Sequence, residues 1–164
     1  MKAILFILLI IVLPSSVYAQ NVPFQVSFTC QTLQPLLDFS YSSIDEMQQG
    51  KEIVNAIQLN LRLKMKGCTM MAKVDYTGTA NTGSLPAGWM STKLINNNAP
   101  NASIPATEIP LGNTNTVLFT QPNHINNGPH DYTFNYNLKL NALNSVCVPP
   151  ATYNFTITYT MTSL

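Results

Sequence analysis

The sequence has no excess of charge of either sign. Its 164 residues include 8 Lys and Arg and 7 Asp and Glu, which gives a formal net charge of +1. One of the basic residues is Lys2, at the very start of the chain; without it, basic and acidic residues are equal in number. A surface that binds nucleic acid or anionic lipid needs clustered basic residues, so this balance argues against both classes of partner.

No apolar run is long enough to cross a membrane as a helix. The longest covers residues 3–13, whereas a transmembrane helix needs about 20 residues. Lys2 before this run, and small residues ending at Ala19 after it, are typical of a secretory signal peptide. We therefore expect residues 1–19 to be cleaved and residues 20–164 to form a single secreted domain, extracellular or at the cell surface, without membrane insertion. In a bacterium the chain would pass through the periplasm.

Catalytic motifs are also absent. The sequence has no G-x-S-x-G, P-loop or H-E-x-x-H pattern, and its acidic residues are scattered singly, so none is selected as a catalytic pair. His124 and His130 are close in sequence and Asp131 follows, but their spacing matches no standard zinc site, and we interpret both as loop histidines. We expect no enzymatic activity, no catalytic, metal-binding or cofactor-binding residues, and no cofactor.

Helix signals are scarce, whereas strict alternation of apolar and polar residues is frequent. Such alternation is typical of antiparallel strands with one buried face. Four long strands are predicted at residues 22–30, 57–65, 132–140 and 153–161. Four shorter strands are predicted at residues 36–41, 69–77, 88–95 and 115–120. Together these segments predict an all-β fold, an antiparallel immunoglobulin-like β-sandwich of about eight strands.

Two segments between the strands carry signals of their own. Ser43 followed by Glu46 and then Gly50 has the order of a helix cap, capping partner and stop. We interpret this segment as a connecting turn, with at most one short helical turn. Residues 96–110 contain three prolines, which cannot donate to a strand ladder, so we place this segment in a loop or at a sheet edge.

The cysteines are odd in number. Cys30, Cys68 and Cys147 would all enter a compartment in which disulfides persist. Cys30 ends the first predicted strand and Cys68 begins another, so a bridge between these two is the favoured pairing. A bridge that uses Cys147, or three unbonded thiols, remain alternatives, and the role of Cys147 stays open. A catalytic thiol is disfavoured because no partner histidine is apparent.

Both ends of the chain resemble a known group of secreted proteins. Cys30, the segment LLDFSYSS at 36–43, the strand NAIQLNLRLKMKGC at 55–68 and the ending VPPATYNFTITYTMT at 148–162 are similar to bacterial pilin-like and spore-coat-protein-U-type subunits. The ending in that family has Gly where this chain has Ala151. The resemblance implies an incomplete or variant immunoglobulin-like sandwich that assembles on the cell surface by donating a strand to its neighbour.

The expected function follows from that resemblance and from the missing catalytic signals. We expect a structural or adhesive subunit of a fimbria-like or pilus-like surface assembly, which contacts protein partners or further copies of itself through an edge strand. The alternative is a secreted carbohydrate- or ligand-binding module that contacts a glycan through loops at residues 96–110 and 121–130. Trp89 is the single tryptophan, and we interpret it as a core residue rather than an exposed sugar platform.

The strand at the start of the expected mature chain has two interpretations. Its apolar face consists of Val22, Phe24, Val26 and Phe28. The segment could be donated to a neighbouring subunit, or it could be an ordinary first strand that pairs within its own chain. Its short length before Cys30 favours pairing within the chain.

Overall fold

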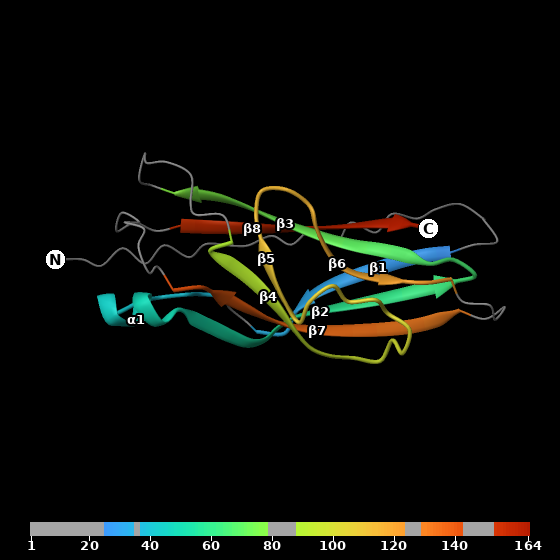
Figure 1. The fold of residues 1–164 in the computed structure, drawn as a ribbon, viewed down its shortest axis with the longest axis horizontal. Helices are drawn as coiled ribbons and strands as arrows, with labels where there is room; N and C mark the ends of the chain where they lie inside the picture. Colours follow the sequence, from blue (N-terminus) through green and yellow to red (C-terminus); the bar gives the residue numbers. More distant parts are fainter. Residues whose placement is uncertain (1–24, 35–36, 79–87, 124–128, 143–152) are drawn as a thin grey trace.

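The computed structural model describes residues 25–34, 37–78, 88–123, 129–142 and 153–164. These ranges form eight strands and one short helix, which are labelled in Figure 1. In chain order the elements are β1 (Gln25–Thr32), α1 (Ile44–Gln49), β2 (Lys51–Lys64), β3 (Cys68–Gly78), β4 (Met90–Asn97), β5 (Glu108–Leu111), β6 (Thr116–Gln121), β7 (His130–Leu140) and β8 (Tyr153–Ser163).

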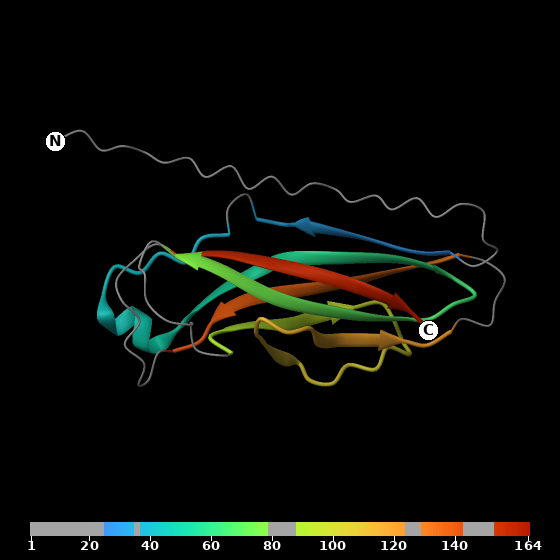
Figure 2. The ribbon, with the colours of Figure 1, turned by 90° about the horizontal axis from the view of Figure 1, so that it is seen from above.

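The strands form two antiparallel sheets arranged like a sandwich. The five-stranded sheet has the order β1-β2-β7-β4-β5, and the three-stranded sheet has the order β6-β3-β8. In Figure 1, β3 and β8 lie above β2 and β7, and Figure 2 shows the same two layers from above. The all-β, antiparallel, sandwich-like architecture predicted from the alternating segments is confirmed.

The core lies between the inner faces of the two sheets. Alternate residues of β2, including Leu59 and Leu61, are at most 1% exposed, as expected for strands with one buried face. Phe119 of β6 stacks on Phe134 of β7, with ring centroids 3.8 Å apart and an interplanar angle of 5°. This contact joins the two sheets at the centre of the molecule.

One predicted strand is wrong. Residues 37–41, the described part of the segment predicted at 36–41, belong to no strand. The alternation there has another cause: Leu37, Phe39 and Tyr41 are partly buried against the core, while the intervening residues are exposed. One-sided packing of an extended chain gives the same period of two as a strand, but without a hydrogen-bonded ladder.

The cap signals around Ser43 produce a real helix rather than the connecting turn that we favoured. The Ser43 hydroxyl accepts a hydrogen bond from the backbone N–H of Glu46 at 3.2 Å, and the Glu46 carboxylate accepts one from the backbone N–H of Ser42 at 2.7 Å. Gly50 ends the helix with a φ of 74°, which favours glycine. No helix in the described ranges has the length and apolar character needed to cross a membrane.

The proline-containing segment also supplies a strand. β5 falls within residues 96–110 and extends to Leu111, and it pairs only with β4, at the edge of the five-stranded sheet. Pro110 lies opposite Ser91 in this pair. A proline is tolerated there because an edge strand leaves one side of its backbone unpaired.

Candidate functional site: two unpaired strand edges

Two strand edges run along the same side of the sandwich. β1 pairs only with β2, and β8 pairs only with β3, so within the described residues each has one side without a strand partner. Figures 1 and 2 both place β1 and β8 beside each other, one in each layer. We call these two edges the β1–β8 seam. Unpaired backbone groups at such edges are ready to pair with a further strand.

The apolar residues at the seam are less buried than those elsewhere in the core. All five inner-face residues of β8 are only partly buried: Tyr153, Phe155, Ile157, Tyr159 and Met161. The inner-face residues of β1 are also partly buried: Val26, Phe28 and Cys30. An additional strand at this position would therefore remove apolar surface from water, which favours association.

Cys30 and Tyr159 are a thiol and a phenol of the seam, and Tyr159 is close enough to Cys30 and to a second phenol, that of Tyr136 in β7, for electrostatic interactions. Burial raises the pKa of Cys30 to about 11. Burial also raises the pKa of Tyr159 well above its usual value, and the nearby Cys30 and Tyr136 raise it further. Tyr136 is 1% exposed, and burial raises its pKa too. All three groups are therefore neutral at physiological pH, and the seam is an apolar surface rather than an ionised one.

Two of the four expected strand-donor or edge residues, Val26 and Phe28, lie within the described residues. Val26 and Phe28 lie in β1, opposite Leu63 and Leu61 of β2, so this part of the segment pairs within its own chain. It is nevertheless an edge segment, since β1 is the outermost strand of its sheet. Val22 and Phe24 lie outside the described residues.

The favoured disulfide between Cys30 and Cys68 is not formed in the structure, and both thiols are free. Cys30 lies in β1 of the five-stranded sheet, whereas Cys68 begins β3 of the three-stranded sheet. Cys147 lies outside the described residues.

Trp89 packs in the core beside the seam, as predicted. It is 7% exposed and makes edge-to-face contacts with two rings of β8, those of Tyr153 at 6.0 Å and Phe155 at 5.7 Å between centroids. Such edge-to-face contacts stabilise a pair of aromatic rings by more than the burial of their apolar surface alone. They hold the beginning of β8 against the end of the five-stranded sheet.

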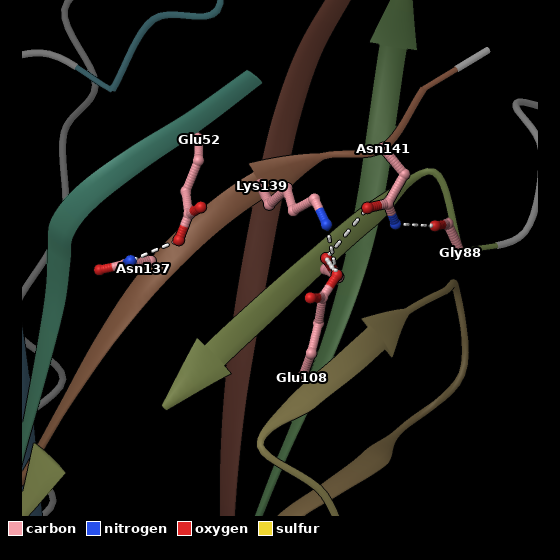
Figure 3. A network of polar contacts seen from close by, with 7 residues as sticks. Glu52, Gly88, Glu108, Asn137, Lys139 and Asn141 are labelled. Carbon is pink, nitrogen blue, oxygen red and sulfur yellow. Dashed lines mark hydrogen bonds and ion pairs between the residues drawn. The ribbon is translucent and has the colours of Figure 1, made fainter. Parts of the chain in front are cut away.

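A polar network on the outer face of the five-stranded sheet was not predicted from the sequence. Figure 3 shows its two parts. Asn137 donates to the Glu52 carboxylate, and Lys139 donates to the Glu108 carboxylate at 3.0 Å. The Ser91 hydroxyl also donates to Glu108 at 3.0 Å, and these hydrogen bonds from Lys139 and Ser91 lower the Glu108 pKa.

This network secures strands rather than forming a catalytic centre. The Asn137 side-chain oxygen accepts from the backbone N–H of Asn55 at 2.8 Å. Asn55 has a φ of 51° and lies where the β2–β7 register shifts, between Ile53 and Ile57. Asn137 thus stabilises the bulge of β2. These contacts could not be predicted from the sequence, because Asn137 and its partners Asn55 and Glu52 are more than 80 residues apart along the chain.

Histidines and acidic residues do not gather into a metal site in the part of the chain that the structure describes. His130 begins β7 and stacks beside Tyr132, with centroids 6.3 Å apart, so its placement in a loop was wrong. His124 lies outside the described residues. Three described acidic residues have a basic or amide partner of their own: Lys73 pairs with Asp75 at 2.8 Å, Arg62 with Asp131 at 3.8 Å, and Asn137 donates to Glu52.

No protein-family model matches this chain, and no curated protein is similar to it in sequence.

Proposed function

We propose that this protein is a secreted, non-enzymatic structural or adhesive subunit of a surface assembly, and that it accepts a strand from a neighbouring subunit at the β1–β8 seam. The observation that carries the proposal is the state of β8. This strand has an alternating apolar face that is only partly buried, and one of its edges has no strand partner among the described residues. Strand addition would satisfy both the backbone edge and the apolar face.

The strand order supports an immunoglobulin-like relationship as part of the same proposal. Constant-type immunoglobulin domains have strands ABED in one sheet and CFG in the other. The order β1-β2-β7-β4 corresponds to A-B-E-D, and β3-β8 corresponds to C-F, with β5 and β6 as additional strands. Strand G, which would lie beside β8, has no counterpart among the described strands. The position left by strand G is therefore where we expect the partner strand to bind.

The proposed donor is the segment before β1 of another copy. Because Gln25–Thr32 pairs with β2 of its own chain, only residues 20–24 of the expected mature chain are left for donation, including Val22 and Phe24. Five residues extend about 17 Å, and the 11 residues of β8 extend about 36 Å. The donated segment would cover about half of β8, so we expect reversible assembly.

The first test compares the mature chain with a variant that lacks residues 20–24. We expect the mature chain to form concentration-dependent oligomers in sedimentation velocity and the shortened chain to remain a folded monomer. Removing residues 20–29 instead would take away more than half of β1, Gln25–Thr32, so that a loss of assembly could not be distinguished from a loss of folding. A mature chain that stays monomeric at the highest attainable concentration would contradict self-assembly.

A second variant tests the receiving strand. Ile157 faces the core side of β8 and is partly buried, whereas Thr158 is the exposed next residue. Ile157→Lys should weaken oligomer formation at least tenfold, and Thr158→Lys should leave it unchanged. Urea denaturation shows whether the lysine variant is folded. If it is not, Ile157→Ala provides a milder change. Equal assembly of the two lysine variants would exclude β8 as the receiving edge.

A further inference from the structure

Four amide side chains form a row across the outer face of the five-stranded sheet. Gln31 of β1 lies opposite Gln58 of β2, Gln58 lies opposite Asn135 of β7, and Asn135 lies opposite Asn96 of β4. We call these residues the amide row. Neighbouring strands are about 4.8 Å apart, so the row extends about 14 Å across the strands.

Hydrogen bonds hold the amide row in one orientation. Gln31 donates to Gln58, Gln58 donates to Asn135 at 2.9 Å, and Asn135 donates to Asn96 at 2.6 Å. The amide nitrogens of Gln31, Gln58 and Asn135 therefore all donate in the same direction across the sheet. A side-chain amide has two N–H donors and two acceptor sites, so the row has further donors and acceptors for a ligand.

A second, shorter line of polar groups supports the row. Asn60 donates to the Gln58 oxygen at 3.2 Å, and the Thr133 hydroxyl donates to the Asn60 oxygen at 3.0 Å. Gln31 and Asn96 are exposed, and Gln58 and Asn135 are partly buried. The network thus fixes side chains that solvent still reaches, which lowers the entropy lost when a ligand binds them.

The band that contains the amide row is uncharged, and charged groups lie on both sides of it. On one side, Arg62 and Asp131 form an exposed pair at 3.8 Å. On the other side are Lys139 and the carboxylates of Glu52 and Glu108, drawn in Figure 3. A ligand centred on the band would therefore be neutral and rich in hydrogen-bonding groups.

We propose that the amide row binds an extended neutral glycan that lies across the strands. Amide side chains provide the paired donors and acceptors that sugar hydroxyls require, and the strand spacing is close to the length of one sugar residue in an extended chain. No aromatic residue lies on the outer face of β1, β2 or β7 in the described residues. Binding would depend on hydroxyl contacts rather than ring stacking and would be weak for one copy.

This inference does not depend on strand donation. Gln31 belongs to β1, but the row lies on the outer face of the sheet, opposite the face that carries the apolar residues of the seam. An assembly of many copies would nevertheless strengthen weak binding through multivalency. Of the loops that the sequence suggested, residues 96–110 and 121–130, the glycan site includes only Asn96. Part of that loop surface, residues 124–128, lies outside the described residues.

The experiment is an NMR titration of isotope-labelled monomeric protein with cellohexaose, chitohexaose and mannohexaose. We expect at least one of these probes, at millimolar concentration, to shift the side-chain amide signals of Gln58 and Asn135. The variant Gln58→Ala/Asn135→Ala should weaken binding at least tenfold. The matched control Thr156→Ala/Thr158→Ala, on the exposed face of β8, should bind like the parent chain.

Several outcomes would overturn the proposal. They are the absence of shifts with all three probes, shifts confined to loops or to β8, and unchanged binding by the double amide variant. If the same amide signals shift with protein concentration in the absence of sugar, the face contacts another copy of the chain instead. Asn135→Asp, which changes charge with little change in shape, replaces the alanine variant if that variant does not fold, and it should also weaken binding.

Discussion

β7 and β8 have the same alternation of apolar and polar residues, yet their apolar faces are buried to different extents. Phe134 and Tyr136 of β7 are 0% and 1% exposed, whereas Phe155 and Tyr159 of β8 are only partly buried. β7 has a strand on each side, and β8 has one strand partner in the described residues. The burial of an inner face thus depends on its neighbours in the sheet as much as on its own sequence.

The largest expected difference between the two strands is in the effect of removing a ring. Phe134→Ala should destabilise the protein by about 3–5 kcal/mol, because it leaves a cavity beside Phe119 in the tightly packed centre. Phe155→Ala should cost about half as much, because its ring is already in partial contact with water. Urea denaturation of both variants, followed by circular dichroism, measures the two free energies of unfolding.

Phe134→Leu serves as the milder variant if the alanine substitution leaves no folded protein, since 5 kcal/mol is comparable to the total stability of a small domain. A synthetic strand bound at the seam should raise the effect of Phe155→Ala and leave that of Phe134→Ala unchanged. Equal effects of the two alanine substitutions in the free protein would show that β8 is as well covered as β7.

The rates at which Cys30 and Cys68 react with a thiol reagent also compare the seam with the buried core. Burial raises the pKa of both Cys30 and Cys68 from 9.0 to about 11, so at neutral pH each has roughly 100-fold less reactive thiolate than an ordinary cysteine. Cys68 is 0% exposed, whereas Cys30 is partly exposed at the seam. In a Cys147→Ser background, iodoacetamide should label Cys30 before Cys68, with both rates rising as the pH approaches 11.

Mass spectrometry of the labelled peptides separates the two rates. A partner strand at the seam should protect Cys30 and have no effect on Cys68. Faster labelling of Cys68, or protection of both thiols together, would mean that the seam is not the accessible edge.

Local patterns predicted much of the fold because each strand carries its own period of two. The alternation around Leu59, Phe134 and Ile157 was sufficient to place three long strands. It failed at Phe39, where an extended segment packs on the core without pairing. The cap signals at Ser43 were interpreted as a turn, because a capped helix of 6 residues has too short a pattern to be distinguished from a turn by sequence.

The candidate site was less accessible to sequence reasoning because it depends on which strands are neighbours. Nothing in the residues around Ile157 indicates that β8 has an unpaired edge. The pairing of Cys30 with Cys68 was wrong: both cysteines lie on apolar strand faces, which is all that the sequence pattern shows, but they belong to different sheets and are free. The amide row joins residues from four strands, and its alignment exists only through the register of those strands.

The smallest expected effect concerns the outer face of the sheet, where Glu108 joins β5 to β7. Glu108→Gln should destabilise the protein at neutral pH by about 0.2–1 kcal/mol, the range of a partly exposed ion pair, since the side chains of Lys139 and Glu108 are 33% and 37% exposed. Hydrogen bonds from Lys139 and Ser91 lower the Glu108 pKa. Its contribution is therefore present above the ordinary glutamate pKa and is lost as the pH falls through the lowered value. Denaturation of both proteins from neutral pH down to about pH 3 should show the difference disappearing in acid.

Asp131→Asn is the matched control. Its partner Arg62 is 3.8 Å away and both side chains are more than half exposed, so this substitution should destabilise the protein less than Glu108→Gln at every pH. A Glu108→Gln effect that persists unchanged in acid would mean that the carboxylate acts through packing rather than charge.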